Sequence, residues 1–225
     1  MTVLVQAHAL RKSFARTEAL RGVSVEIGAG ETVAITGPSG SGKSTLLLCL
    51  AGILRPESGE VTFDQQRLDR LGEAERTRLR RREMGIVLQF GQLVPELTAA
   101  QNVALPLLLE RHDRGAARRA ALSWLERLGA DDLADQVPAE LSGGQAQRVA
   151  VARALVTGPK VVFADEPTGA LDTVAGEQVL GQLLGAVRDT GATLVMVTHD
   201  NRVAARADRE VVLRDGSVEA AGVVS

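Results

Sequence analysis

Hydrophobic and polar residues alternate near the start of the chain. Val23, Val25 and Ile27 are separated by single polar residues, and this period of two predicts an antiparallel strand with one buried face. We therefore expect the chain to begin with a hairpin-rich antiparallel sheet.

Two later segments are short and almost continuously apolar: Val161–Ala164 and Thr193–Val197. Such runs are typical of strands that are buried on both faces of a parallel sheet. A short apolar strand is also expected at Val33–Thr36. A Gly-rich loop follows that strand, and an apolar helix is predicted after it, through Ile53 to an end near Arg55–Pro56. Further strands are expected at Val61–Phe63 and Met84–Leu88, and a closing hairpin is expected at Glu210–Leu213 and Asp215–Gly216.

The region between Leu97 and Leu141 has a helical pattern. Ala121, Leu125 and Leu128 recur on one helix face, and charged residues occupy the other face. We expect one domain over residues 1–225, with a helical subdomain at about 90–150 inserted in it. The predicted class is α/β, a sheet with helices on both faces, together with an antiparallel β subdomain and the inserted helices.

Composition narrows the possible partners. The chain has 225 residues, 45% of them hydrophobic, and a net charge of −2, so nothing in its overall charge favours nucleic acid and no nucleic-acid partner is expected. The single Cys49 cannot form an internal disulfide or a multi-cysteine metal site. The first ten residues show no basic leader, and no apolar run approaches the roughly 18 residues that span a bilayer. Any membrane role is therefore expected to come through a partner.

A run of arginines between residues 76 and 82 is the one basic cluster that could bind phosphate backbones. It is flanked by Glu73, Glu75 and Glu83, and Leu79 lies inside it. Mixed charge of this kind favours a solvated helix face over a nucleic-acid site.

The Gly-rich loop carries the clearest chemistry. It fits the pattern G-x-x-x-x-G-K-[ST] and stands between a predicted strand and a predicted helix, as a phosphate-binding loop must. Backbone N–H groups of such a loop converge on phosphate oxygens, Lys43 can reach the terminal phosphates, and the Ser44 hydroxyl can bind Mg²⁺. A glycine turn with a chance lysine is the alternative, which the flanking elements disfavour. The candidate ATP-binding residues of the loop are Gly37, Pro38, Ser39, Gly40, Ser41, Gly42, Lys43, Ser44 and Thr45.

Two acids follow the apolar run Val161–Ala164. Ligands bind at the carboxyl ends of strands in such sheets, so Asp165 is expected to hold Mg²⁺ and Glu166 to orient and deprotonate the attacking water. His199 ends another apolar run and is expected at the same edge, in polar contact with the γ-phosphate or the water. The alternative is that the two acids lie in a solvated turn and have no part in the chemistry.

A second anion site is predicted at the start of another helix. Ser142 is followed three residues later by Gln145, which is the spacing of a capping box. Gly143 and Gly144 between them weaken a helix start unless a close backbone approach is needed. An ordinary well-capped helix is the alternative.

Together, these motifs resemble ATP-binding-cassette nucleotide-binding domains over nearly the whole chain. The segments that carry the resemblance are the phosphate loop, Gln89, Leu141–Arg148, Val161–Glu166, Ala170–Asp172 and Thr198–Asp200. The resemblance implies that Gln89 touches Mg²⁺ and senses a membrane partner, and that the Ser142–Gln145 signature acts in trans on the γ-phosphate bound by the opposite subunit. It also implies that Phe14 stacks on adenine, where the family more often has Tyr.

Within this family, the chain is similar to the ATPases of macrolide exporters, lipoprotein-release systems and cell division. The likeness lies in Leu93–Thr98, Asn102–Val103, Leu105–Leu107 and Glu166–Asp172. In the segment Gln89-Phe90-Gly91-Gln92, Gly91 stands where Asn is common. The region Gln89–Leu105 is expected to couple the chain to the membrane subunit. Its apolar docking surface for a cytoplasmic helix of that subunit is expected at Phe90, Leu93, Val94 and Pro95.

The resemblance implies a Mg-dependent ATPase that powers a separate membrane permease of the exporter or lipoprotein and peptide-handling kind. ATP and Mg²⁺ are the expected cofactors. A head-to-tail homodimer, or a pair with a homologous ATPase, is expected at the cytoplasmic face of the membrane. A regulatory ATPase that signals through a membrane partner without transport is the first alternative. A DNA-maintenance ATPase is the second, although the chain shows no sustained heptads between Lys43 and Glu140.

Overall fold

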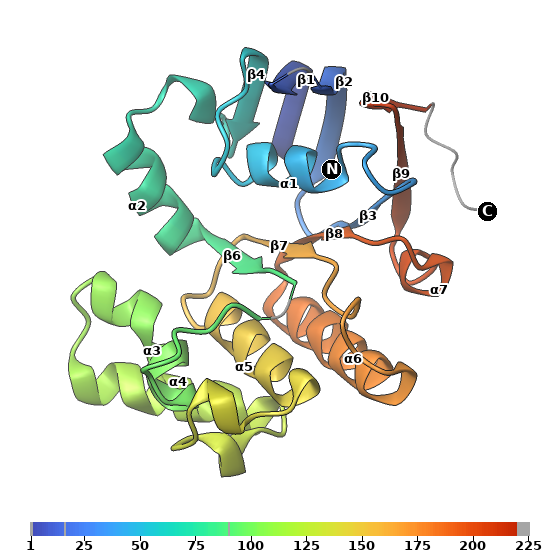
Figure 1. Cartoon of the computed structure of the whole chain (residues 1–225). Helices are drawn as coiled ribbons and strands as arrows, with labels where there is room; N and C mark the ends of the chain where they lie inside the picture. The colour runs from blue at the N-terminus through green and yellow to red at the C-terminus, as the bar shows by residue number, and fades with distance from the viewer. Residues whose placement is uncertain (1, 16, 90, 220–225) are drawn as a thin grey trace. The chain divides into compact units, whose positions relative to one another are not determined.

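The computed structural model describes residues 2–15, 17–89 and 91–219, and the chain groups into two units (Figure 1). Unit 1 comprises Met1–Arg80 and Thr193–Ser225, and unit 2 comprises Arg81–Ala192. The phosphate loop therefore belongs to unit 1, and the signature segment belongs to unit 2.

An antiparallel sheet opens unit 1, as the alternating pattern predicts. Val23 and Ile27 are almost fully buried while Ser24 and Glu26 are exposed. The first two strands pair along their length, with Ala7 opposite Val25. The sheet has the order β2-β1-β4-β5, formed by β1 (Val3–Phe14), β2 (Thr17–Gly28), β4 (Ser58–Phe63) and β5 (Gln66–Arg67).

The other strands of unit 1 form a mainly parallel arrangement in the order β10-β9-β3-β8. All residues of β3 and β8 are buried, which confirms the short strand predicted at β3 and the interpretation of the β8 run as a strand buried on both faces. Ile35 lies opposite Val197 in a parallel register, so the carboxyl ends of β3 and β8 meet at one edge. The bounds are β3 (Thr32–Thr36), β8 (Thr193–Val197), β9 (Arg209–Arg214) and β10 (Ser217–Val218), the last two forming the predicted antiparallel hairpin.

Helix α1 (Lys43–Leu50) follows the phosphate loop and contacts β1, β2 and β8. The prediction that it continues through Ile53 was wrong. Gly52 has a φ of 63°, its N–H donates to the Cys49 carbonyl at 3.0 Å, and the Ile53 N–H donates to the Leu48 carbonyl at 2.9 Å. These two bonds form a Schellman ending, which a glycine at this position permits because it has no Cβ.

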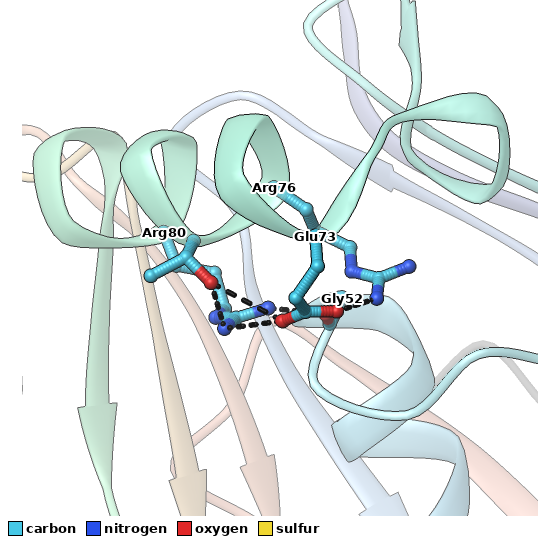
Figure 2. Close-up of polar contacts among 5 residues, drawn as sticks. Gly52, Glu73, Arg76 and Arg80 are labelled. Atoms are coloured by element: carbon cyan, nitrogen blue, oxygen red, sulfur yellow. Dashed lines mark hydrogen bonds and ion pairs between the residues drawn. The ribbon is translucent and has the colours of Figure 1, made fainter.

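Helix α2 (Glu73–Glu83) carries the arginine run. Figure 2 shows the side chains of Arg76 and Arg80 close to Gly52, just after the end of α1. Arg80 donates to the Gly52 carbonyl at 2.6 Å, and Arg76 is buried in an ion pair with Glu73. A guanidinium at a helix C-terminus complements the partial negative charge there. The predicted solvated face is correct for Arg78, which is exposed, and wrong for Arg76, because its side chain packs beside Gly52.

Unit 2 contains a parallel strand pair and a group of helices. Strand β6 (Met84–Val87) pairs with β7 (Val161–Asp165), with Val87 opposite Ala164. The helices are α3 (Ala99–Leu109), α4 (Arg114–Arg127), α5 (Gly143–Leu155) and α6 (Thr173–Thr190), of which α3, α4 and α5 pack on one another (Figure 1). Ala121, Leu125 and Leu128 are buried, which confirms the predicted apolar stripe. The short helices of the chain are η1 (Leu68–Arg70), η2 (Asp131–Leu133), η3 (Pro138–Glu140) and α7 (Asn201–Ala204).

Cys49 is a core residue of α1, as expected. Its side chain is 1% exposed, and burial raises the pKa of its thiol to about 11. The thiol is therefore protonated and unreactive near neutral pH. Across residues 2–15, 17–89 and 91–219, no helix combines the length and the apolar character needed to cross a membrane.

Candidate functional site

The phosphate loop of unit 1 connects β3 to α1, and its backbone demands glycine. Gly37 and Gly42 have φ values of 135° and 100°. A Cβ on Gly37 would lie 1.9 Å from the Leu213 carbonyl oxygen, and one on Gly42 would lie 2.3 Å from the Ala19 carbonyl oxygen. The loop therefore packs closely against β2 and β9. A residue with a Cβ at position 37 or 42 would clash with these strands.

Lys43 opens α1 and folds back over the same loop. Its side chain is largely buried, with 7% of the residue exposed, and Nζ donates to the Gly37 carbonyl at 2.9 Å and the Pro38 carbonyl at 2.8 Å. Pro38, Ser39 and Gly40 on the loop crest are exposed. The arrangement combines a cation, exposed loop backbone and a helix N-terminus, which are the elements of a phosphate site.

His199 follows β8 at the edge where β3 also ends. Thr198 holds this turn, since its N–H donates to the Ile35 carbonyl at 3.1 Å and its Oγ1 accepts from the Asp200 N–H at 3.0 Å. Hydrogen bonds from the Arg202 side chain and backbone lower the pKa of Asp200 to about 2. His199 itself is exposed. Because it follows β8, which is in parallel register with β3, it lies at the edge from which the phosphate loop also begins.

Phe14 ends β1 in unit 1. It is 47% exposed, and Lys12 Nζ lies 5.5 Å from the centroid of its ring. An exposed aromatic ring with a nearby cation can stack on a planar ligand.

In unit 2, Gln89 and Glu166 come together at the carboxyl edge of β6 and β7. A Cβ on Gly169 would lie 2.9 Å from Glu166 Oε2 and 3.5 Å from Gln89 Nε2, so both side chains border this glycine. Glu166 has a φ of 48°, and its carbonyl accepts from the Gly169 N–H at 3.1 Å. Asp165 ends β7 and is partly exposed.

The capping box at the start of α5 is confirmed. Ser142 Oγ accepts from the Gln145 N–H at 3.3 Å, and Gln145 Oε1 accepts from the Ser142 N–H at 2.8 Å. The glycines between them also serve packing within the chain, because a Cβ on Gly143 or on Gly144 would lie 3.3 Å from the Leu171 or the Ala175 side chain. A cavity of about 150 Å³ separates this helix start from the end of β7, lined by Gly143, Ala146, Gln147, Glu166, Pro167, Ala170 and Leu171.

Sequence reasoning missed the role of Asn102. This residue is fully buried in α3, where its Oδ1 accepts from the Val94 N–H at 2.7 Å and its Nδ2 donates to the carbonyls of Val94, Leu97 and Thr98 at 3.0–3.1 Å. One amide therefore shapes the segment that the sequence suggests as a docking surface for a membrane subunit. An asparagine inside an otherwise apolar helix was the available signal. Phe90, assigned to the same surface, lies outside the described residues.

The predicted magnesium ligands offer oxygen donors of the kind that Mg²⁺ prefers: the Ser44 hydroxyl, the Gln89 amide and the Asp165 carboxylate. In the part of the chain that the structure describes, no group of three or more His, Cys, Asp or Glu side chains could hold a metal by itself. This donor set suits an ion that is bound jointly with nucleotide phosphates and water, as Mg²⁺ usually is.

Residues 20–169 match the family described as ABC transporter. The chain is 41% identical over 221 residues to LolD, the ATP-binding protein of a lipoprotein-releasing system in Shewanella oneidensis, and 44% identical over 220 residues to YbbA, an uncharacterized ABC transporter ATP-binding protein of Escherichia coli K12. Each alignment covers 96% of both chains. The dimeric ATP-binding cassette MJ0796, bound to ADP and Pi after hydrolysis, superimposes with a TM-score of 0.92 at 39% identity over 99% of both chains. The predicted fold class is thereby confirmed.

Proposed function

The chain belongs to the ABC transporter family, and we propose that it is the ATP-hydrolysing subunit that powers a separate membrane-spanning permease. The likeness to relatives extends over almost their whole length, which supports transfer of the complete activity rather than of one motif. We propose that both units work as one ATP-binding domain, with the helical subdomain at about 90–150 inside unit 2.

The phosphates of ATP are assigned to the loop Gly37–Thr45, with the Lys43 ammonium on the terminal phosphates. Phe14 would stack on the adenine. Ser44, Gln89 and Asp165 would hold Mg²⁺, which supplies positive charge to the phosphates when it is bound. The closely packed glycines and the exposed loop crest support this assignment.

Glu166 is assigned as the general base. It would take a proton from the attacking water as the water oxygen bonds to the γ-phosphorus and the bond from that phosphorus to the ADP oxygen breaks. His199 would contact the γ-phosphate or the water. The observation that carries the proposal is the convergence of Glu166 and Gln89 on Gly169, because it places a carboxylate beside a candidate magnesium ligand at one sheet edge.

The segment Ser142–Gln145 is assigned to the γ-phosphate bound by a second subunit, so that two chains pair head to tail. The exposed, capped N-terminus of α5 supports this assignment, since its free N–H groups favour an anion. The dimeric state of MJ0796 also supports it. A homologous ATPase, as the second subunit of a heterodimer, could supply the same segment to the γ-phosphate.

The partner is proposed to be a permease of the exporter or lipoprotein and peptide-handling kind, with this chain bound peripherally at the cytoplasmic face of the membrane. The similarity to LolD of a lipoprotein-releasing system supports this class.

The test is ATP hydrolysis by the purified chain, measured alone, with a reconstituted permease of the lipoprotein-release class, and with DNA. We expect hydrolysis that the permease stimulates and DNA leaves unchanged. Stimulation by DNA alone would contradict the proposal. A permease that stimulates hydrolysis while no labelled lipoprotein or peptide is released from vesicles would instead identify a regulatory ATPase.

A further inference from the structure

Arg153 is a partly buried cation near the end of the signature helix α5, and backbone oxygens hold it. Its Nη2 donates to the Gly91 carbonyl at 2.8 Å and its Nη1 donates to the Gln92 carbonyl at 3.0 Å. Burial lowers its pKa. Over the described ranges, it has no carboxylate partner. A guanidinium taken from water without a counter-ion costs free energy, so these two bonds must compensate for its burial.

Gly91 lies against the same helix. It is buried with a φ of 70°, and a Cβ there would lie 3.2 Å from the Ala146 carbonyl oxygen and 3.5 Å from Ala150 Cβ. Ala146, Ala150 and Arg153 are spaced i, i+4 and i+7, which places them on one helix face. The segment Gly91–Gln92 therefore lies along two turns of α5, and it can do so because Gly91 has no side chain.

This contact joins two motifs that are separate in the sequence. The Gly91 N–H donates to the Leu88 carbonyl at 3.1 Å, which closes a turn over Gln89. The same α5 begins at the Ser142 cap and continues for 13 residues, a rigid element about 20 Å long. The Gln89 turn and the Ser142 cap are thus both attached to one helix.

We propose that Arg153 is a positioning residue that fastens the Gln89 turn to the signature helix, so that a displacement of one displaces the other. The inference rests on the proposed function, in which Ser142 meets the γ-phosphate of the opposite subunit, and on the expectation from the sequence that the Gln89 region senses the membrane partner. The planar guanidinium presents its N–H donors to the two carbonyls in a rigid fork, whereas a lysine ammonium is a single charged atom on a flexible stem and would hold them less rigidly.

The first test compares amide hydrogen exchange in Arg153→Lys with that in Arg148→Lys. Arg148 is a matched control, because it lies on α5 and donates to a backbone carbonyl, that of Gly129, in a different loop. We expect exchange at Gly91 and Gln145 to be about tenfold faster in Arg153→Lys and unchanged in Arg148→Lys. Unchanged exchange at both amides in Arg153→Lys would overturn the inference.

Gly91→Ala provides a second variant that leaves Arg153 intact and strains the contact of the loop with α5, because alanine disfavours a φ of 70° and its Cβ would lie 3.2 Å from the Ala146 carbonyl oxygen. It should produce the same exchange pattern, and protection that persists at Gly91 and Gln145 would contradict the inference. Hydrogen exchange does not require ATP hydrolysis, so this comparison tests the inference separately from the proposed function. A wild-type chain without ATPase activity would overturn the proposed function but would leave the exchange comparison valid.

The second test is a double-mutant cycle on ATP hydrolysis with Gln89→Ala. Arg153→Lys should lower kcat by about tenfold while the Kd for ATP stays within about twofold. If Arg153 acts through the Gln89 turn, Arg153→Lys should add no further loss to Gln89→Ala. Multiplicative losses, with the thermal midpoint lowered to match, would show a structural role only and overturn the inference.

Discussion

The carbonyl oxygen of Leu213 lies 1.9 Å from where a Cβ on Gly37 would stand. The closing strand β9 and the phosphate loop thus touch backbone to backbone. Any side chain at position 37 must displace one of them, so the shape of the loop depends on a strand that is distant in the sequence.

Gly37→Ala should therefore weaken both stability and ATP binding. Backbone strain at a φ of 135° costs on the order of 1–3 kcal/mol, and the contact with Leu213 adds to it. Gly30→Ala is the control, because Gly30 has a φ of 76° with nothing within 4 Å of its Cβ position. Thermal unfolding and calorimetric ATP titration would measure both effects. Equal losses in the two variants would show that the Leu213 contact is unimportant.

Lys43→Ala should lose ATP affinity and turnover together, because the removed ammonium is assigned to the terminal phosphates. The carbonyls of Gly37 and Pro38 also lose a donor in this variant. Isothermal titration with Mg·ATP gives the affinity directly. Wild-type binding in Lys43→Ala would contradict the assignment of the phosphate loop.

Glu166→Gln should still bind ATP but hydrolyse it more slowly by about 10²–10⁴, the usual scale for loss of a general base. The amide keeps the shape and hydrogen-bonding capacity of the carboxylate and cannot accept the proton. Single-turnover hydrolysis with excess protein isolates this step. Turnover close to that of the wild type would show that another group is the base.

The same Glu166→Gln variant should run as a dimer with Mg·ATP and mainly as a monomer with ADP. The γ-phosphate supplies charge for the Ser142 helix terminus of the opposite subunit, and ADP lacks that group. Light scattering at micromolar concentration would detect the difference. A variant that stays monomeric with saturating ATP, even with the permease present, would rule out the head-to-tail site.

Glu31 should make the stability of unit 1 sensitive to acid. Burial raises its pKa, but hydrogen bonds from Arg209 at 2.6 Å and from the Gly28 N–H at 2.7 Å outweigh this, and the net pKa is below its ordinary value of 4.5. The unfolded chain therefore binds the proton first, so this stabilisation is present above pH 4.5 and is lost as the pH falls through the lower folded-state pKa.

Chemical denaturation between pH 6 and about 3 checks the acid sensitivity. The free energy of unfolding should fall less steeply in Glu31→Gln than in the wild type. Glu75→Gln, at an exposed position of α2, is the control and should follow the wild-type curve. Parallel curves for all three proteins would contradict the assigned role of the Glu31–Arg209 pair.

Local patterns in the sequence were sufficient for most of the elements. The alternation at Val23–Ile27, the apolar run at Thr193–Val197 and the Ser142–Gln145 capping box are each set by neighbours within a few residues, because strand and helix periods and helix caps are short-range properties. The end of α1 was also encoded locally, in Gly52, and the prediction placed it too late.

Contacts between distant segments could be decided only by the tertiary structure. Arg76 packs beside Gly52, and Asn102 shapes the segment Val94–Thr98. Arg153 donates to the carbonyls of Gly91 and Gln92. The residue types alone do not reveal any of these contacts. The sequence determines which groups can donate, accept or pack. Which partner each group meets depends on how the chain brings remote segments together. Once these segments are buried, a lost hydrogen bond or an added Cβ costs more free energy than it would at a solvent-exposed position.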